Sequence, residues 1–258
     1  MKMLVAVAQG EPGERLLADA RMVAHAIDAG VRVLHVKEDP AEPDLRLPPR
    51  LTTNVDVEER VGDPVMEIVE AAEEVDVLGF ALRGARDECV GTVSQALLAG
   101  APTTLLVIPP GAPPMTALRR VLVPLEGSPS SSEAMRQAEE LLCRKGREIV
   151  VLHVGTSASP TEPGSFGVPR IMDQEQYEWP AWHDEFRMRF SSCPRGGRHR
   201  TLVEVGDPAE TILAQAQKLK AQLIVLAWSR DVGEGKAQLV RSLLCGAPCP
   251  LLLVPAAA

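Results

Sequence analysis

The segment Glu148–Val154 has the sequence EIVVLHV, and the segment Leu223–Leu226 has the sequence LIVL. Their apolar residues follow one another without alternation, which is typical of strands buried on both faces of a parallel sheet. A stretch with apolar residues at helical spacing, Ser128–Leu142, precedes the first of them. Buried strands that alternate with amphipathic helices predict an α/β fold of doubly wound type with a parallel sheet.

Three short motifs occur twice in the chain, in the same order each time. The paired copies are Val33–Val36 with Val151–Val154, Val61–Pro64 with Val205–Pro208, and Gly100–Pro102 with Gly246–Pro248. Ordered repetition of this kind indicates that one structural unit is duplicated. We therefore expect two tandem doubly wound domains, each with a five-stranded parallel sheet.

A proline-rich seam, Pro109–Pro114, separates the two copies, because proline at this density cannot continue a helix or a central strand. We expect a first domain at residues 1–110 and a second at residues 117–258. The prolines that follow Val36 predict a bare loop at this crossover of the first domain, whereas Arg170–Phe190 can be helical in the second. The predicted strands are Met3–Ala8, Val31–Val36, Asn54–Glu58, Val75–Phe80 and Thr104–Ile108, then Arg120–Leu125, Glu148–Val154, Thr201–Val205, Gln222–Ala227 and Pro250–Val254.

The composition is that of an ordinary globular protein and excludes several classes of function. Of the 258 residues, 45% are hydrophobic and 24% are charged, and the formal net charge is −8. Phosphate binding requires a basic face, so we expect no nucleic-acid partner. No apolar run reaches the roughly 18 residues that cross a bilayer, and the N-terminus does not resemble a signal peptide. The five scattered cysteines indicate no disulfide framework, so we expect a cytoplasmic protein with no membrane partner.

The order of the motifs resembles the universal stress protein family, in its tandem form with two domains in one chain. The second half carries the opening Val121–Ser128, the turn Gly206–Pro208 and the closing Ala247–Pro255. The resemblance implies adenine-nucleotide-hydrolase-like, Rossmann-like domains with the strand order 3-2-1-4-5. In many members an aspartate at the end of the first strand meets ribose and adenine, and glycines after the fourth strand hold the phosphates. Glycines let backbone N–H groups approach a phosphate, and the following helix N-terminus adds positive potential.

The first half keeps only part of the implied nucleotide site. Ala8 or Gln9 occupies the position of the aspartate, so the carboxylate is absent. The first glycine is replaced by Ala81 and the spacer is three residues short. The residues that remain are Gly84, Gly91, Thr92 and Val93. They could hold the phosphates of ATP or AMP, or Gly91 and Thr92 could simply begin the last helix, with Thr92 as its N-cap.

The second half keeps a different part of the site. Glu126 takes the aspartate position and is followed by Gly127 and Ser128. These three residues could meet a nucleotide, or they could form a strand-to-helix turn with a capping hydroxyl. After the fourth strand, Trp228 stands near the place of the glycines, and its ring is large enough to fill the space of a phosphate. If a nucleotide binds, the first half is the better candidate for its phosphates.

Other patterns of reactive residues predict no catalytic or metal site. His35 and His153 lie at equivalent strand ends, where ligands can bind, but their repetition favours a shared structural hydrogen bond. Cys245 and Cys249 are four residues apart, with no histidine or second cysteine pair nearby, so we predict no zinc site. Because no nucleophile, base and orienting group occur together, we do not expect an enzyme.

We therefore expect a non-catalytic stress-response or regulatory protein with a degenerate nucleotide site. The alternative is a sensor that binds ATP or AMP through the first domain, with at most slow hydrolysis. The resemblance also implies that the fifth strands pair, here Thr104–Ile108 and Leu251–Val254, which are apolar edge strands. We expect them to pair within the chain around a pseudo-two-fold axis, so that the chain is its own partner. Any further partner is expected to be a protein of unknown identity.

Overall fold

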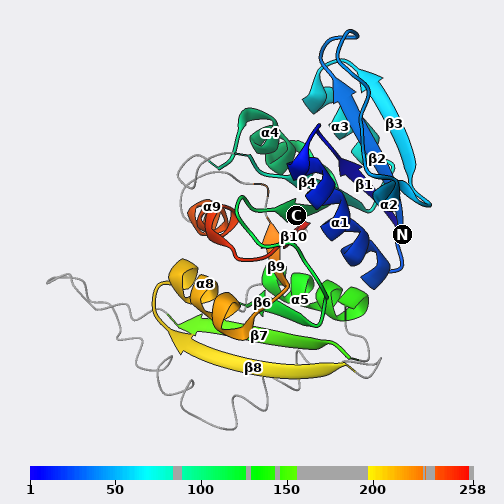
Figure 1. Ribbon diagram of the computed structural model, residues 1–258. Coiled ribbons are helices and arrows are strands. Elements are labelled where there is room, and N and C mark those ends of the chain that lie inside the picture. Colours follow the sequence, from blue (N-terminus) through cyan, green and yellow to red (C-terminus); the bar gives the residue numbers. More distant parts are fainter. Residues whose placement is uncertain are drawn as a thin grey trace, which may run out of the picture.

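The computed structural model describes residues 1–83, 89–125, 129–142, 146–155, 197–228, 230 and 236–255. Within them, ten strands form one continuous sheet in the order β3-β2-β1-β4-β5-β10-β9-β6-β7-β8. Helices cover both faces of this sheet (Figure 1). When the strands of each half are numbered separately, both halves have the predicted order 3-2-1-4-5.

The strands of each half run parallel to their neighbours. The first half contributes β1 (Lys2–Ala6), β2 (Gly30–Lys37), β3 (Asp56–Val61), β4 (Val77–Ala81) and β5 (Thr104–Ile108). The second half contributes β6 (Arg120–Pro124), β7 (Glu148–Gly155), β8 (Arg198–Val205), β9 (Leu223–Trp228) and β10 (Leu251–Pro255). The doubly wound α/β fold predicted from the apolar runs is therefore confirmed.

The helices divide between the two faces of the sheet. They are α1 (Glu11–Ala26), α2 (Pro49–Thr52), α3 (Pro64–Ala72), α4 (Thr92–Gly100), α5 (Pro129–Leu142), α8 (Pro208–Leu219) and α9 (Lys236–Gly246). One core contains buried residues of α1 and α5, and the other contains residues of α3, α4, α8 and α9. Because side chains alternate along a strand, Met3 and Val5 of β1 belong to the first core and Leu4 to the second.

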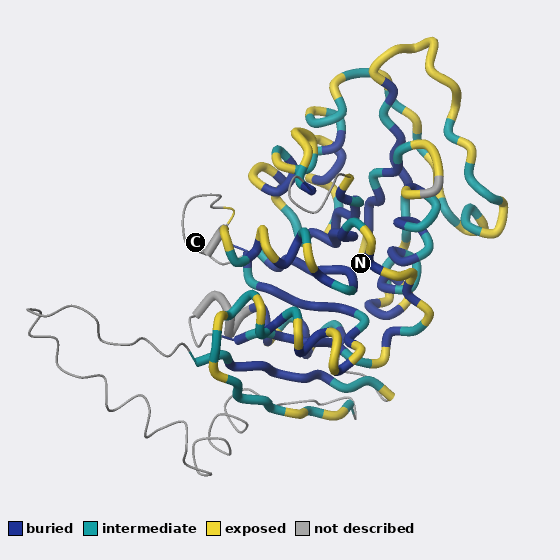
Figure 2. The backbone as a smooth tube through the Cα atoms, turned by 60° about the vertical axis from the view of Figure 1, so that its left-hand side comes forward, coloured by how far each residue is buried: buried dark blue, intermediate teal, exposed yellow. Residues whose placement is uncertain are grey.

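The middle of the sheet is buried, and its outer strands are partly exposed (Figure 2). In β9, Leu223, Ile224 and Val225 are each 0% exposed. In the edge strand β3, exposed and half-buried residues alternate, and several of them are charged. The uninterrupted apolar runs of the sequence therefore belong to strands covered by helices on both faces.

The two halves join through their fifth strands. β5 and β10 pair antiparallel in the centre of the sheet, with Leu106 opposite Leu252, Leu105 opposite Leu253 and Val107 opposite Leu251. All three residues of β5 in this ladder are at most 1% exposed. Each apolar edge is thus covered by the other half of the same chain.

The helix α2 corrects one prediction, because a bare loop was expected after β2. This helix is a single turn that begins at Pro49, with Pro48 as its N-cap. Proline is tolerated in the first turn of a helix, where its missing N–H group would have no partner. The prolines therefore shorten the helix instead of excluding it. The segment Arg170–Phe190, which the sequence allows to be helical, lies outside the described residues.

A disulfide corrects a second expectation. Cys89 and Cys245 are bonded, with their Cα atoms 5.5 Å apart, although 156 residues separate them. The bond connects the segment between β4 and α4 to the last turn of α9. Cysteine spacing could not indicate it, because the two cysteines meet only when the halves pack together.

Candidate functional site

The first candidate site lies at the carboxyl end of β1, where the chain turns into α1. Gly10 has a φ angle of +94°, in the region that favours glycine. Gly13 lies so close to the carbonyl oxygen of Ala8 that a Cβ atom on it would be 2.1 Å from that oxygen. Both glycines are therefore required by the tight turn. This turn places Gln9 at the end of the sheet where doubly wound folds bind ligands.

Gln9, in the position of the family's aspartate, bonds to the chain that follows β2. Its side-chain nitrogen donates to the carbonyl oxygens of Asp44, at 2.7 Å, and Pro43, at 3.3 Å. Its side-chain oxygen accepts from the backbone N–H of Arg46, at 3.4 Å. An ionised aspartate can only accept hydrogen bonds, so it could not make the first two. The amide is therefore suited to holding this loop.

A buried lysine holds the same loop from the end of β2. The Nζ atom of Lys37 lies 2.9 Å from Oδ1 of Asp44 and 3.0 Å from Oε2 of Glu59. These hydrogen bonds, Asp44 first, raise the pKa of Lys37, and the bond to Lys37 lowers the pKa of Asp44. The other oxygen of Glu59 accepts from the backbone N–H of Leu45, at 2.7 Å. The loop is thus tied to the carboxyl ends of both β1 and β2.

The remaining first-half candidates lie at the start of α4. Gly91, Thr92 and Val93 are exposed. Gly91 is the N-cap, no side chain caps the helix, and Thr92 is its first residue. These residues begin the last helix of the first half, with Gly91 and not Thr92 as the N-cap, and their binding of a phosphate stays a prediction. Among the described residues, no atom lies within 4 Å of a Cβ atom placed on Gly91, so this end of α4 is open in that part of the structure. Gly84 lies outside the described residues.

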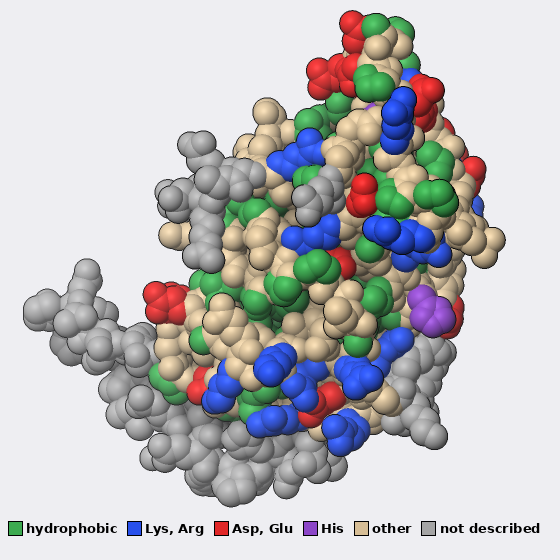
Figure 3. Space-filling view, in the orientation of Figure 1, with side chains coloured by type: hydrophobic (Ala, Val, Ile, Leu, Met, Phe, Trp, Pro, Cys, Tyr) green, Lys and Arg blue, Asp and Glu red, His purple; other side chains and the backbone are tan. Residues whose placement is uncertain are grey.

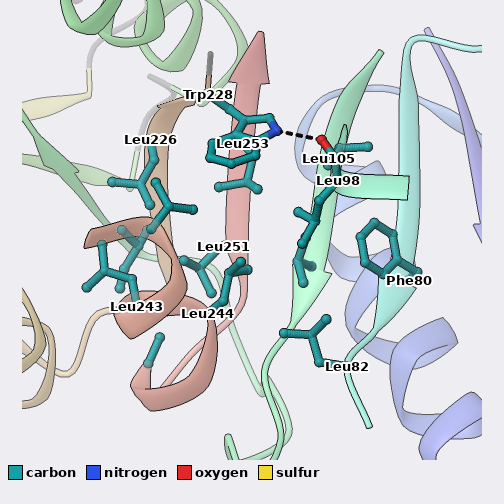
Figure 4. Close-up of a cluster of buried hydrophobic side chains, with 14 of the residues drawn as sticks. Phe80, Leu82, Leu98, Leu105, Leu226, Trp228, Leu243, Leu244, Leu251 and Leu253 are labelled. Carbon is teal, nitrogen blue, oxygen red and sulfur yellow. Dashed lines mark hydrogen bonds between the residues drawn. The ribbon is translucent and has the colours of Figure 1, made fainter. Parts of the chain in front are cut away.

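In the second half, Trp228 replaces the glycine segment with a contact to the first half. Glu126, Gly127 and Ser128 lie outside the described residues. Trp228 ends β9 and is only 5% exposed. Its Nε1–H group donates to the carbonyl oxygen of Leu98 in α4, at 2.8 Å (Figure 4). The ring therefore fills the end of β9 and reaches across the boundary between the halves.

The reason for this contact is a proline. A helical carbonyl ordinarily accepts from the N–H group four residues later, and for Leu98 that residue is Pro102, which has no N–H group. The indole of Trp228 supplies the missing donor. Two residues later, Nη2 of Arg230 donates to the carbonyl oxygen of Pro102, at 2.7 Å. The segment after β9 thus caps the C-terminal end of α4.

The repeated histidines have the structural role that the sequence predicted. Nδ1 of His35 lies 2.9 Å from the carbonyl oxygen of Val7, and Nδ1 of His153 lies 2.9 Å from that of Leu125. A carbonyl oxygen can only accept, so each Nδ1 carries a proton. Both rings are buried. In each half, this hydrogen bond fastens the second strand to the turn that follows the first strand.

A buried carboxylate on α1 was not found from the sequence. Asp19 is 0% exposed, and its Oδ1 accepts from the backbone N–H of Met115 in the proline-rich seam, at 2.8 Å. Its Oδ2 lies 3.8 Å from Nε of Arg15. Burial raises the pKa of Asp19 above its ordinary 3.8, although the Met115 hydrogen bond and Arg15 oppose the shift. The only sequence signal is an acidic residue among the apolar positions of α1.

We expect Asp19→Asn to become more stable relative to the wild-type protein as the pH rises from about 4. The folded protein holds the Asp19 proton more tightly than the unfolded chain does, because its pKa is raised. The wild-type free energy of unfolding therefore falls as the pH rises from the ordinary value of 3.8 through the raised pKa. Asparagine keeps an acceptor for Met115 and does not titrate. Urea denaturation of both proteins at a series of acid pH values measures the difference.

Glu73→Gln, which removes an exposed carboxylate, is the control for the loss of one negative charge. The free energy of unfolding of Asp19→Asn, relative to the wild-type protein, should increase with pH more steeply than that of Glu73→Gln. A difference that moves the other way would mean that Arg15 and Met115 outweigh burial.

The described residues contain no cluster of His, Cys, Asp and Glu that could hold a metal ion. Cys249 is 4% exposed, and burial raises the pKa of its thiol to about 12, so it stays protonated and unreactive. Among the helices of the described ranges, none has the length and apolar character needed to span a membrane.

Charge is distributed unevenly between the halves. Residues 1–116 contain 10 basic and 19 acidic side chains, and residues 117–258 contain 17 basic and 16 acidic ones. In Figure 3, acidic side chains gather at the top, on the first half, and basic ones gather below, around α8 and the strands beside it. Exposed basic residues of the second half include Arg119, Arg198, Arg200, Lys218 and Lys220.

Comparison with known proteins agrees with the duplicated fold and the strand order. The sequence profile of the universal stress protein family matches residues 117–255, more than half of the chain. The chain belongs to the universal stress protein family. A search of curated proteins found no sequence match to this universal stress protein.

Several solved structures match this universal stress protein over nearly its whole length. A universal stress protein from Archaeoglobus fulgidus is 18% identical, with a TM-score of 0.67, and the match covers 99% of this chain and 96% of that chain. A functionally unknown protein from Pseudomonas aeruginosa is 13% identical, with a TM-score of 0.68, and the match covers 99% and 92%. At such low identity the likeness concerns the fold, here the tandem arrangement of both halves.

Proposed function

We propose that this universal stress protein is a non-catalytic regulatory protein in which the nucleotide position of the second half serves as a contact between the halves. The observation that carries the proposal is the buried ring of Trp228, bonded to the carbonyl oxygen of Leu98. A phosphate cradle needs small residues whose N–H groups point at the ligand. At the end of β9 the large ring of Trp228 occupies that place, and its N–H group is hydrogen-bonded to α4.

The first half supports the same proposal at the position of the ribose-binding carboxylate. The amide of Gln9 donates to the carbonyl oxygens of Pro43 and Asp44, and Lys37 fastens the same loop. These residues are engaged with the protein itself. The aspartate of the nucleotide-binding members is thus replaced by a group that keeps the loop in place.

A second candidate function is a sensor that binds ATP or AMP through the first half alone. The open start of α4 favours it, because Gly91 leaves space beside the first turn, and the positive end of the helix dipole attracts phosphate. This site would lack the family's carboxylate. We therefore expect it to hold a nucleotide weakly.

Equilibrium dialysis with labelled ATP and with labelled AMP tests the two functions. We expect no saturable binding tighter than about 1 mM, which corresponds to about −4 kcal/mol, and no hydrolysis of ATP. Tight one-to-one binding would contradict the proposal and favour the sensor.

A pair of variants then locates any binding that is found. Gly91→Leu places a bulky side chain at the open start of α4, and Gly100→Leu places the same side chain at the other end of that helix. Both glycines are exposed and have open space at their Cβ positions. A first-half sensor loses binding in Gly91→Leu and keeps it in Gly100→Leu. Equal affinity in both variants would show that the start of α4 holds no phosphate.

A further inference from the structure

The disulfide between Cys89 and Cys245 is a second cross-connection between the halves. Trp228, at the end of β9, donates to Leu98 of α4, and Arg230 donates to Pro102 just after that helix. The segment after β4 is anchored to α9 by the Cys89–Cys245 bond. Each half thus fastens the chain after its fourth strand to the last helix of the other half. One connection is non-covalent, and the other can be opened by reduction.

The two cysteine residues differ in their exposure to solvent. Cys89 is 1% exposed and belongs to the apolar core that contains α4 and α9. Cys245 is half-buried, and it lines a cavity of about 370 Å³. The cavity is also lined by Pro110, Pro113 and Gln217. Cys245 therefore borders a space that a small molecule can enter, whereas Cys89 is enclosed by the core.

The cavity has the size of a small-molecule site. Known sites for small ligands have volumes of about 300–1,000 Å³, and this one is at the lower end of that range. Two of its walls are prolines of the seam, which hold the opening in a restricted conformation. A low-molecular-weight thiol such as a short peptide is small enough to enter it.

Attack on Sγ of Cys245 makes Cys89 the leaving group, because Cys89 is the other sulfur of the bond. Cys89 lies two residues before Gly91, the N-cap of α4. The positive end of the helix dipole favours a thiolate at this position, whereas the apolar core around Cys89 disfavours it. Cys249 does not attack the disulfide itself, because burial raises the pKa of its thiol to about 12 and keeps it protonated.

We propose that Cys245 is a thiol–disulfide exchange site for a small-molecule thiol that enters this cavity. The thiolate of the small molecule attacks Sγ of Cys245, the bond to Cys89 breaks, and Cys89 leaves as a thiolate that takes a proton from solvent. A second small thiolate attacks the small-molecule sulfur of the mixed disulfide and releases Cys245. The protein disulfide becomes two thiols, and two small thiols become one small disulfide.

Reduction opens the connection without separating the halves. The β5–β10 pairing and the bond from Trp228 to Leu98 do not involve either sulfur. The bond that is lost joins the chain that enters α4 to the end of α9. The oxidised small disulfide reverses the reaction by attack of Cys245 on it, followed by attack of Cys89 on the mixed disulfide. No nucleotide takes part in the exchange.

Partial reduction of the wild-type protein by reduced glutathione tests the direction of attack. Samples are quenched with acid, and the cysteine peptides are analysed by mass spectrometry. We expect glutathione on Cys245 in at least about tenfold excess over Cys89, as the difference in access predicts. Glutathione mainly on Cys89, or a disulfide that stays oxidised until the protein is unfolded, would overturn the proposal. Reduction by thioredoxin and not by glutathione would overturn it as well, because the reductant would then be a protein.

Two variants on adjacent positions of α8 test the entry path. Gln217 lines the cavity, and Lys218 is exposed but is not among its lining residues. Gln217→Trp should slow reduction by glutathione at least about fivefold, since exchange depends on access to the attacked sulfur. Lys218→Trp should leave the rate within about twofold. Equal rates in the two variants would show that the thiol does not enter through this cavity.

Discussion

Trp228→Ala should lower the free energy of unfolding by about 3–5 kcal/mol, the usual cost of truncating a buried tryptophan. The ring is 5% exposed and belongs to the core that also contains Leu98 and Leu253 (Figure 4). Truncation leaves a cavity at the boundary between the halves and removes the donor to the carbonyl oxygen of Leu98. Pro102 cannot replace that donor, because it has no N–H group. Since the lost contacts join the two halves, we also expect them to unfold less cooperatively.

Urea denaturation followed by circular dichroism measures this loss, and two variants separate its causes. Trp228→Phe keeps most of the ring volume and loses the hydrogen bond, so it should cost about 1–3 kcal/mol. Arg230→Ala removes an exposed contact to Pro102 and should cost less than about 1 kcal/mol. If Trp228→Ala unfolds within about 1 kcal/mol of the wild-type protein, the contact does not hold the halves together. The proposal that this position serves as a contact would then lose its main support.

The fold could be predicted from the sequence because its signals are local. The run Leu223–Leu226 is apolar at every position, and the structure buries it between two layers of helices. The Gly-Asp-Pro turns predict helix starts, and Asp63 and Asp207 each accept from the backbone N–H group three residues later. The duplicated motifs then predicted the same order of strands and helices in both halves, without knowledge of contacts between distant residues. Among the elements of the described residues, several strand bounds differ by a few residues and the short helix at Pro49 was not expected. Proline is disfavoured inside a helix but not at its start.

The candidate site was harder to predict because its residues form hydrogen bonds with residues that are distant in the sequence. The sequence showed that Trp228 is too large for a phosphate cradle, but not that Leu98, 130 residues away, lacks a donor. The sequence shows that Gln9 lacks the carboxylate of the family's aspartate. Its hydrogen bonds to Pro43 and Asp44 depend on how the loop after β2 folds against it, and the sequence does not show this. These pairings arise from packing between segments, and neither periodicity nor spacing contains them.

The disulfide and the buried Asp19 have the same origin. Cys89 and Cys245 lie in different copies of the repeat, and they meet only because β5 pairs with β10. Asp19 resembles any acidic residue of an amphipathic helix until the seam passes over it and Met115 donates to it. Sequence repetition predicts what the two halves share. It does not predict the disulfide or the bond from Met115 to Asp19, because the residues involved are not shared by the two copies of the repeat.

Gly13→Ala should lower the free energy of unfolding by about 3 kcal/mol, near the upper end of the usual cost of overpacking. Alanine is the better helix former by about 1 kcal/mol, and Gly13 lies in the first turn of α1, so propensity alone predicts the opposite sign. The Cβ atom would lie 2.1 Å from the carbonyl oxygen of Ala8 and 2.7 Å from Cγ1 of Val7. The oxygen belongs to the backbone of the turn, so the turn itself would have to shift.

Gly100→Ala is the matched control, because Gly100 ends a helix, is exposed and has no atom within 4 Å of its Cβ position. There we expect a gain of about 0.4–1 kcal/mol, since alanine restricts the unfolded chain. Urea denaturation of both variants decides the sign of each change. The Gly13 variant should also weaken the hold of Gln9 on the loop after β2, because Gln9 lies in the same turn. Faster proteolysis within residues 38–48 in Gly13→Ala, and not in Gly100→Ala, would report that effect. A Gly13 variant as stable as the wild-type protein would mean that the turn yields easily, and the carboxyl end of β1 would then not be fixed by this close approach.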